Sequence, residues 1–206
     1  MKNLFQRLSK ANNKDEFITI VSGLPRSGTS MMMKMLEAGG IPAITDELRE
    51  ADEDNPKGYY EFERVKAMDK GDTAWVTEGR GKIVKVISAL LKHLPPGEQY
   101  RVVFVRRNMS EILASQRKML IRRGENPDKM DDEQMAVLFE KHLKQVDEWL
   151  IAQPNFRVLY VHYSDILANP LPHVNELNRF LGGNLDTAAM AAAVDPGLYR
   201  NRKSGD

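Results

Sequence analysis

The fold is decided by one stretch, ITIVSGLPRSGTSMMMKMLEAGG, which covers residues 18–40. It opens with a β-branched run, continues through a turn bounded by two glycines, and ends in an apolar segment with helical spacing. A strand, a glycine-bounded turn and a helix in this order build a phosphate-binding loop, because the unpaired N–H groups at a helix N-terminus attract anions. The sequence therefore predicts such a loop at residues 23–30.

This loop departs from that of the nucleoside triphosphatases, in which Gly-x4-Gly is followed by Lys and then Ser or Thr. Gly23 and Gly28 keep the spacing, but Thr29 takes the lysine position and Arg26 lies inside the loop. A site for ATP and Mg²⁺ thus lacks a principal cation, whereas arginine supplies a planar, permanently charged group. A glycine-bounded turn between a strand and a helix can also be only a turn, so the loop alone leaves its ligand open.

The composition sets outer limits on fold and partners. With 206 residues, 42% of them hydrophobic, we expect a single domain over residues 1–206 around one sizeable core. The formal net charge of +1 gives no overall attraction to nucleic acid or to a membrane, and we expect neither as a partner. The sequence has no cysteine, which excludes disulfides and thiolate metal sites and fits a reducing compartment. Without an apolar run of signal-peptide or membrane-spanning length, we expect a cytoplasmic protein, and a homodimer stays open.

Short β-rich runs alternate with longer segments of helical spacing. This alternation predicts an α/β protein, a three-layer P-loop-type fold whose central, mostly parallel sheet is flanked by helices. A weakly periodic region at residues 41–80 is expected to be an excursion that serves as a lid or substrate loop. The runs are strands at 17–21, 83–87, 101–105 and 158–161 and helices at 30–38, 110–123, 131–152 and 171–181.

A second strand and helix carry polar groups that suit an anion. In RVVFVRRNMSEILASQRKML, residues 101–120, the strand ends at an arginine pair, Asn108 makes a turn, and Ser115 lies eight residues after Arg107. That separation exceeds two helical turns. Both groups can therefore face one ligand only if Arg107 precedes the helix and reaches back along it. Taken alone, an arginine at a strand end and a helical serine are also ordinary surface groups.

Together the two segments resemble the sulfotransferases that use 3′-phosphoadenosine 5′-phosphosulfate (PAPS). Residues 25–30 match the family loop Pro-[Lys/Arg]-Ser-Gly-Thr-[Thr/Ser], which binds the 5′-phosphosulfate, and residues 107–115 match Arg-[Asn/Asp]-x6-Ser, which binds the 3′-phosphate. A third match, VLYVHYSDILANP at 158–170, places a tyrosine where a family tyrosine lies near the adenine. The resemblance implies a donor site made of Pro25, Arg26, Ser27, Gly28, Thr29, Ser30, Arg107, Ser115 and Tyr163.

The resemblance also implies a reaction. A sulfuryl group would pass in line from PAPS to a hydroxyl or amine of a small-molecule or carbohydrate acceptor, with no metal ion required. By analogy with phosphoryl transfer, Arg26 and the loop N–H groups would neutralise charge on the leaving phosphate oxygen. Two alternatives stay open: a P-loop small-molecule kinase, which would need a Walker lysine and an acid that holds Mg²⁺, and a non-catalytic nucleotide-binding module.

The general base departs from one branch of the family. The cytosolic enzymes use a histidine in a strand motif Lys-Thr-His-Leu-Pro; in KIVKVISALLKHLP, residues 82–95, alignment of Lys85 with the family lysine puts Ile87 at the histidine position. This favours a carboxylate base, and Glu61 and Glu63 lie on one side of the chain if it is extended there. Glu61 is the first choice because aromatic residues surround it, although a solvated acidic loop is the alternative. Lys85 is expected to be a second catalytic cation near the sulfuryl group, or else exposed at a strand edge.

The last residues, 196–206, form a basic tail. Family members often close the nucleotide site with a late Arg-Lys-Gly segment, so the resemblance implies that Arg200 or Arg202 reaches the 3′-phosphate. A polar tail with glycines is equally typical of disorder. The four histidines are scattered along the sequence and predict no metal site.

Overall fold

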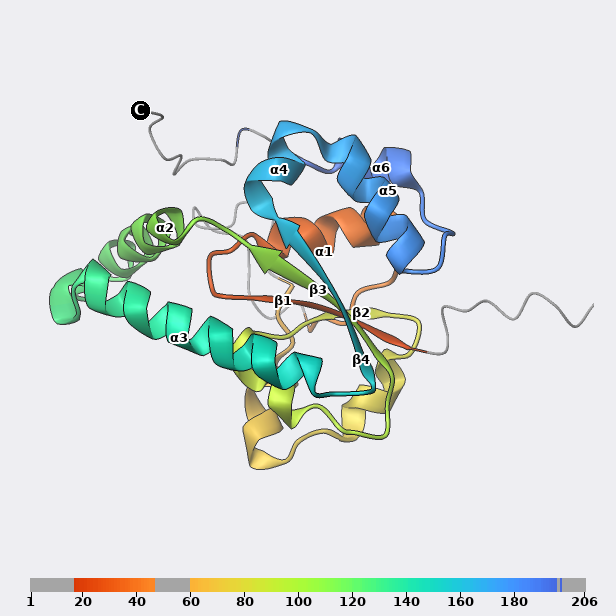
Figure 1. The fold of residues 1–206 in the computed structure, drawn as a ribbon, viewed down its shortest axis with the longest axis horizontal. Coiled ribbons are helices and arrows are strands. Elements are labelled where there is room, and N and C mark those ends of the chain that lie inside the picture. The colour runs from red at the N-terminus through yellow and green to blue at the C-terminus, as the bar shows by residue number, and fades with distance from the viewer. Residues whose placement is uncertain (1–16, 47–59, 196, 198–206) are drawn as a thin grey trace, which may run out of the picture.

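A computed structural model describes residues 17–46, 60–195 and 197. Its centre is a four-stranded parallel sheet in the order β2-β1-β3-β4 (Figure 1). The chain passes from β1 to one side of the sheet and then returns to the other side, so the strand order reverses next to β1. In open parallel sheets, ligands bind beyond the carboxyl ends of the strands at such a reversal. The strands are β1 (Ile18–Gly23), β2 (Ile83–Lys85), β3 (Tyr100–Arg106) and β4 (Phe156–His162).

Helices follow the strands as the sequence predicted, and four short 3₁₀ helices add to them in the described residues. None of the helices in this part of the chain is long and apolar enough to cross a bilayer. The α-helices are α1 (Thr29–Ala38), α2 (Met109–Arg122), α3 (Asp132–Ile151), α4 (Tyr163–Ala168), α5 (Pro170–Phe180) and α6 (Thr187–Ala192). The 3₁₀ helices are η1 (Glu63–Lys70), η2 (Ala74–Gly79), η3 (Ser88–His93) and η4 (Pro127–Lys129).

The sheet divides the apolar core into two layers. Val21 and Ile83 point to one face, where they pack against α1, α4, α5 and α6. Ile20 and Val84 point to the other, where they pack against α3 and the first three 3₁₀ helices. Successive side chains of a strand alternate between faces, so a strand that is covered on both sides has to be apolar throughout. The predicted α/β fold with a parallel sheet flanked by helices is confirmed.

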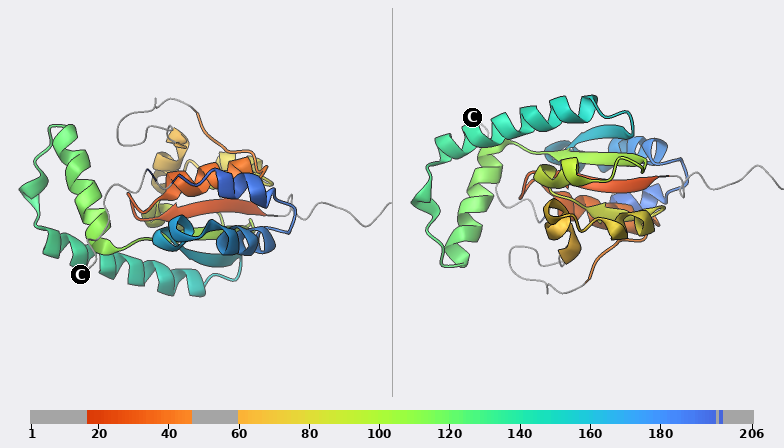
Figure 2. Two further views of the ribbon diagram at one scale, coloured as in Figure 1. Left: turned by 90° about the horizontal axis from the view of Figure 1, so that it is seen from above. Right: turned by 90° about the horizontal axis from the view of Figure 1, so that it is seen from below.

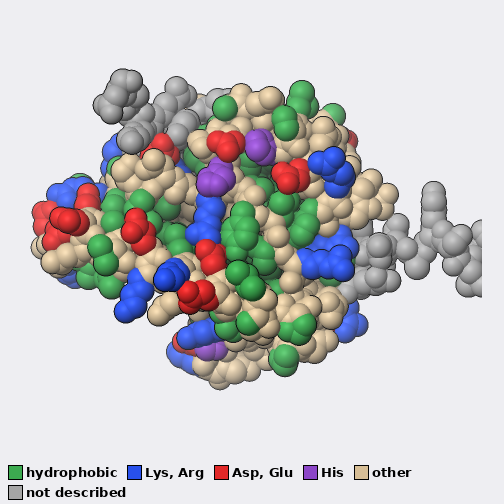
Figure 3. Space-filling model, viewed as in Figure 1, with side chains coloured by type: hydrophobic (Ala, Val, Ile, Leu, Met, Phe, Trp, Pro, Cys, Tyr) green, Lys and Arg blue, Asp and Glu red, His purple; other side chains and the backbone are tan. Residues whose placement is uncertain are grey.

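Helices α2 and α3 form a hairpin that extends past the carboxyl ends of the strands (Figure 2). The second half of α3 returns over the sheet, where Val146 is buried and Asp147 accepts a hydrogen bond from Arg106 at 2.6 Å. Near the tip of the hairpin, Val137 and Leu138 are exposed. Acidic and basic side chains are interspersed over the face viewed in Figure 3, in keeping with the small net charge.

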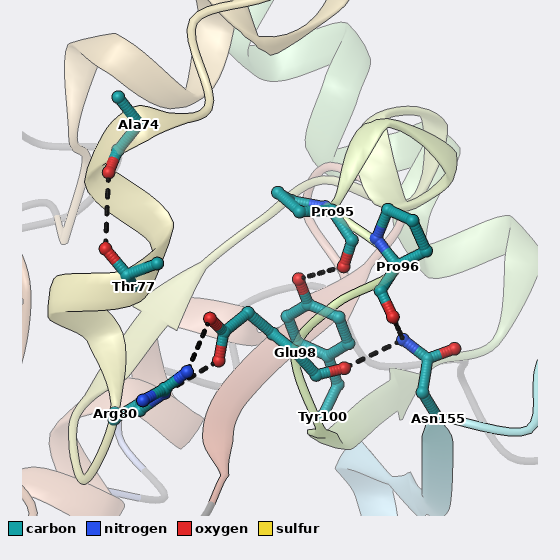
Figure 4. Close-up of polar contacts among 8 residues, drawn as sticks. All are labelled: Ala74, Thr77, Arg80, Pro95, Pro96, Glu98, Tyr100 and Asn155. Atoms are coloured by element: carbon teal, nitrogen blue, oxygen red, sulfur yellow. Dashed lines mark hydrogen bonds and ion pairs between the residues drawn. The ribbon is translucent and has the colours of Figure 1, made fainter.

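A polar network closes the amino end of the sheet (Figure 4). Arg80 donates two hydrogen bonds of 2.8 Å to the carboxylate of Glu98. The buried Tyr100 donates its hydroxyl proton to the carbonyl of Pro95 at 2.7 Å, and Asn155 donates to the carbonyl of Glu98 at 2.8 Å. Each of these groups has a partner, so this end of the sheet is tied together by hydrogen bonds.

The predicted excursion at residues 41–80 is anchored at both of its ends. Near its start, the N–H of Ile44 donates to the carbonyl of Ile83 at 2.8 Å, along the outer edge of β2. Near its end, η1 and η2 pack into the second core layer, where Trp75 is buried. Its middle, residues 47–59, lies outside the described residues, and a role as a lid or substrate loop stays a prediction.

Candidate functional site

The phosphate loop connects β1 to the first turn of α1. Gly28 is the N-terminal cap of this helix and has a positive φ of 105°, a conformation that glycine adopts without steric cost. A Cβ atom at Gly28 would lie 2.3 Å from Cδ2 of Tyr163, which leaves no room for any other residue. The sequence uses glycine here both for the turn and for the close approach of α4. The loop N–H groups therefore lie at the N-terminus of α1, the positive end of the helix dipole, as an anion site requires.

Arg26 has a strained backbone within this loop. Its φ of 70° is the only positive value among the described residues other than glycine. Such a conformation costs an arginine roughly 1–3 kcal/mol and persists only when the surroundings enforce it. The surroundings here are on α2: Nε of Arg26 donates to Oγ of Ser115 at 2.9 Å, across 89 residues of sequence. The predicted loop arginine and the predicted helix serine are therefore in direct contact.

Arg107 is held from three sides. It precedes Asn108, whose side chain caps α2 by accepting from the N–H of Ser110 at 3.0 Å, so it lies before the helix as the spacing required. Its Nη1 donates to the backbone carbonyl of Arg26 at 3.1 Å. Its guanidinium lies 4.5 Å from the centre of the Tyr163 ring, a cation–π distance. Arg107 thus joins the phosphate loop, the start of α2 and the start of α4.

Glu111 provides the third contact of Arg107, and it was absent from the residues predicted from sequence. Its Oε2 accepts from Nε of Arg107 at 2.9 Å, and the two side chains are only 5% and 8% exposed, respectively. A carboxylate at this depth is tolerated because its charge is paired and hydrogen-bonded. The signal was present in the sequence as an arginine and a glutamate four residues apart, a spacing that brings side chains together at a helix start.

Two buried serine hydroxyls find no hydrogen-bond partner in the described part of the chain. They belong to Ser22, the second-last residue of β1, and to Ser27, in the phosphate loop. Ser27 is 1% exposed. An unpaired hydroxyl costs roughly 1–3 kcal/mol when it is buried, so nearly all such groups in proteins are satisfied. A phosphate in the loop is a ligand that could accept from Ser27.

Tyr163 lies beneath the loop, at the start of α4. It is buried, and burial raises the pKa of its hydroxyl above the ordinary value. The charge of Asp195, in the C-terminal segment, also raises this pKa. Arg200 and Arg202, predicted to reach the 3′-phosphate, follow this segment but lie outside the described residues.

Lys85 lies at the carboxyl end of β2, in parallel register with Val21 of β1. Ile83, two residues earlier in the same strand, packs against α1 in the first core layer. Because alternate side chains share a face of a strand, Lys85 also lies on the α1 face. Its partner in the sheet, Val21, lies two residues before Gly23, the last residue of β1. This position agrees with a role beside the phosphate loop, which stays a prediction.

The two predicted carboxylates share one partner. Lys66, in η1, lies 2.6 Å from Glu63 and 3.6 Å from Glu61. The hydrogen bond from Lys66 to Glu63 is the main cause of the raised pKa of this lysine. Glu61 is more enclosed than Glu63, and its backbone carbonyl accepts from the Thr45 hydroxyl at 3.0 Å. Both carboxylates therefore lie in an ion-pair cluster at the start of η1, and their role as general base stays a prediction.

The aromatic residues that favoured Glu61 pack in different directions. Tyr60 lies against the first core layer and donates its hydroxyl proton to Glu37 of α1 at 2.6 Å. Phe62 packs edge-to-face against Trp75 in the second layer, with ring centres 5.1 Å apart. They connect this segment to both layers of the core. Tyr59, the third aromatic neighbour, lies outside the described residues.

Over residues 17–46, 60–195 and 197, no group of three or more His, Cys, Asp or Glu side chains is placed to hold a metal ion. His142, on α3, instead shares a hydrogen bond of 2.8 Å with the hydroxyl of Ser88. Burial lowers the pKa of His142, so the neutral imidazole is favoured in this contact.

Comparison with known proteins identifies the family. The model of the sulfotransferase domain family matches residues 18–204, nearly the whole chain. The protein belongs to this family. No curated protein matches the sequence closely enough to count as a relative.

One solved sulfotransferase structure supports the fold, and two others are similar at lower scores. The sulfotransferase domain from the curacin biosynthetic pathway is 14% identical, with a TM-score of 0.52 over 92% of this chain and 93% of that one. The sulfotransferase domain of the Synechococcus PCC 7002 olefin synthase is 15% identical, with a TM-score of 0.48 over 94% and 91% of the two chains. A sulfotransferase from Alicyclobacillus acidocaldarius is 14% identical, with a TM-score of 0.48 over 88% and 87%.

Proposed function

We propose that this sulfotransferase domain transfers a sulfuryl group from PAPS to a hydroxyl or amine of a small-molecule or carbohydrate acceptor. The observation that carries the proposal is the contact between Arg26 and Ser115 at 2.9 Å. This contact joins two motifs that the family resemblance assigns to opposite ends of one donor, the 5′-phosphosulfate and the 3′-phosphate. The lack of cysteine in the sequence supports the further proposal of a cytoplasmic location.

The donor's two anionic ends would be held by different kinds of group. The 5′ end would lie at the N-terminus of α1, against the backbone N–H groups of residues 26–30 and the hydroxyl of Ser27. The 3′-phosphate would lie at the start of α2, against Arg107 and Ser115. Tyr163 would support both parts from below, because its ring contacts Gly28 and Arg107.

The chemistry follows from this placement. When bound, PAPS would supply an activated sulfuryl group, whose bond to the 5′-phosphate oxygen breaks as the acceptor oxygen or nitrogen bonds to sulfur. The loop N–H groups and a nearby cation, with Lys85 the candidate on the α1 face of β2, would stabilise the charge that collects on the departing oxygen. Removal of one such donor in other enzymes raises the barrier by about 2.7–4 kcal/mol. The acceptor proton would pass to a carboxylate, with Glu61 the first candidate.

The test is a calorimetric titration of the full chain with adenosine 3′,5′-bisphosphate, the desulfated product, in the presence of EDTA. We expect binding that needs no metal ion and that is much stronger than the binding of ATP. Arg107→Gln should abolish it, because the charge at the 3′-phosphate is lost.

Arg80→Gln is a matched control for this variant. It also removes an arginine that is paired with a buried glutamate, Glu98, but at the opposite end of the sheet. It should leave the affinity for the bisphosphate unchanged. If the bisphosphate does not bind while ATP binds in a Mg²⁺-dependent manner, the sulfotransferase proposal is wrong and the kinase alternative is favoured. Binding of the bisphosphate without turnover of PAPS on any acceptor would favour a non-catalytic module.

A further inference from the structure

We infer that the acceptor is received on the face of the sheet that α3 covers, where His142 takes the proton of the attacking hydroxyl or amine and Ser88 holds the imidazole in position. This inference rests on the proposed function, because it concerns the acceptor side of the same reaction. It assigns the general base to α3, in place of the carboxylate Glu61, which lies in the ion-pair cluster around Lys66.

Ser88 and His142 are far apart in the sequence but form a close polar pair. Oγ of Ser88 and Nε2 of His142 lie 2.8 Å apart. Ser88 is 3% exposed, whereas His142 is half-buried, so the histidine side chain can still contact a ligand. When Nε2 carries the hydrogen and donates it to Ser88, the lone pair of Nδ1 can accept a proton. Within the described part of the chain, Nδ1 has no hydrogen-bond partner.

The pair lies past the carboxyl ends of the strands. Ser88 begins η3, three residues after Lys85 ends β2. On α3, Asp147 contacts Arg106, the last residue of β3, and His142 lies five residues nearer the hairpin tip, about 7.5 Å along the helix axis. Because β1 lies between β2 and β3, the contact between η3 and α3 spans the end of β1, from which the phosphate loop starts.

The pair and the donor loop lie on different faces of the sheet. His142 is one turn before Val146, which is buried in the second core layer, so it shares the side of α3 that covers the sheet. Ser22 points to the same layer as Ile20, and its buried hydroxyl finds no partner in the described residues. Helix α1 covers the other face. A donor at the N-terminus of α1 and an acceptor at His142 would therefore approach the sulfuryl group from opposite sides, as in-line transfer requires.

The transfer step balances with His142 as the base. The acceptor oxygen or nitrogen bonds to sulfur and gives its proton to Nδ1, while the electron pair of the breaking sulfur–oxygen bond stays on the 5′-phosphate oxygen. Burial and the charge of Lys92, on η3, lower the pKa of His142, so the imidazole is neutral near pH 7 and can accept a proton. Among the charged groups of the described residues, Lys92 is the one that shifts this pKa.

Sulfuryl transfer from PAPS to phenol and to 4-nitrophenol tests the base. At about pH 8.5, 4-nitrophenol is largely ionised and needs no base, whereas phenol must lose a proton. In His142→Gln, whose amide can still donate to Ser88, kcat with phenol should fall about a hundredfold to ten-thousandfold, while kcat with 4-nitrophenol changes less than about threefold. His173→Gln is the matched control, because it changes a half-buried histidine on α5, at the opposite face of the sheet.

Two further measurements distinguish a catalytic role from a structural one. In the wild type, kcat/KM with phenol should fall as the pH drops below 6.5, the ordinary histidine pKa, because His142 becomes protonated there. Lys92→Gln should move this fall to higher pH, because a neighbouring positive charge is lost. In nuclear magnetic resonance spectra, the imidazole signals of His142 should shift when phenol is added to the complex with adenosine 3′,5′-bisphosphate, and those of His173 should not.

An equal loss of turnover with both phenols in His142→Gln, at unchanged affinity for the bisphosphate, would show that the pair only supports the fold. The inference would then be wrong while the proposed function stands. A selective loss of phenol turnover in Glu61→Gln, or imidazole signals of His142 that do not respond to phenol, would also overturn it. Failure of the wild type to bind the bisphosphate overturns the inference together with the proposed function.

Discussion

The two ends of the sheet are built on opposite principles. At the amino end, Arg80, Glu98, Tyr100 and Asn155 satisfy one another and the adjacent backbone (Figure 4). At the carboxyl end, the loop contains a strained arginine and a buried hydroxyl without a partner in the described residues. Proteins concentrate strain and unsatisfied groups at functional sites and stabilise the rest of the fold to compensate. The difference supports the proposal that the carboxyl end binds a ligand, independently of any motif.

The largest expected effect concerns the buried pair at the carboxyl end. Arg107→Met should lower the free energy of unfolding by about 3–5 kcal/mol, because it leaves the carboxylate of Glu111 buried without its main partner. The double variant with Glu111→Leu should recover most of that loss, since apolar side chains replace a buried ion pair at little cost. It should not recover binding of adenosine 3′,5′-bisphosphate.

Urea unfolding and calorimetric titration of the wild type, the single variant and the double variant measure the two quantities separately. If the double variant also binds the bisphosphate, then Arg107 contributes only to stability, and the contrast between the two ends of the sheet would lose its functional meaning.

The next effect concerns the close packing of the loop on Tyr163. Gly28→Ala should destabilise the fold and abolish donor binding, because the added methyl group would lie 2.3 Å from the ring. Gly40→Ala is the control: it has a similar positive φ of 94°, but no atom lies within 4 Å of the added Cβ. It should cost only the backbone term, about 1–2 kcal/mol, and spare binding.

In thermal unfolding, the free energy of unfolding of Gly28→Ala should be lower than that of Gly40→Ala by about 1–3 kcal/mol, the usual cost of overpacking. Equal stability of the two variants would mean that the Tyr163 ring moves aside for the methyl group at no cost in free energy of unfolding. The loop would then be less rigidly supported than its contacts indicate.

Much of the fold could be predicted because parallel strands buried on both faces read as apolar runs. The sequence placed all four strands and four of the helices within a few residues of their positions. It missed the 3₁₀ helices η1 to η4, since segments this short give little helical periodicity. Strand β2 ends at Lys85, earlier than predicted, because the chain turns into η3 at Ser88.

The candidate site could be predicted only where its groups lie in a local motif. The glycine spacing revealed the loop, and the resemblance supplied Arg107 and Ser115. The contact of Arg26 with Ser115 spans 89 residues, and no local pattern encodes it. The orphan hydroxyl of Ser27 also depends on burial, which a single sequence does not reveal. Glu111 could have been predicted, because its four-residue spacing from Arg107 is a local signal.

A smaller effect is expected at the amino end of the sheet. Tyr100→Phe removes the hydroxyl that donates to Pro95 at 2.7 Å and should lower the free energy of unfolding by about 0.5–1.5 kcal/mol at neutral pH. Nucleotide affinity and turnover should not change, because this end lies opposite the loop. A change in affinity would show that the two ends are coupled through the sheet.

Alkaline titration sharpens this prediction. Burial raises the pKa of Tyr100 well above its ordinary value of 10.0, so the unfolded chain releases this proton at a lower pH than the folded protein does. The free energy of unfolding of the wild type should therefore fall as the pH rises above about 10. Tyr100→Phe lacks this term, and its deficit relative to the wild type should shrink with rising pH. A deficit that stays constant up to pH 11 would contradict the burial of the hydroxyl.

Ser27→Ala should have the smallest effect on stability, and any effect should be stabilising, unlike those of the preceding variants. Because the Ser27 hydroxyl is buried and finds no partner in the described residues, its removal should leave the free energy of unfolding unchanged or raise it by up to about 1 kcal/mol. The same change should weaken binding of adenosine 3′,5′-bisphosphate by about tenfold, since a donor to the 5′-phosphate is lost. Ser22→Ala, at the neighbouring orphan hydroxyl in β1, should match its stability but keep the wild-type affinity. Loss of stability in Ser27→Ala with unchanged affinity would place this hydroxyl among the structural groups and remove it from the binding site.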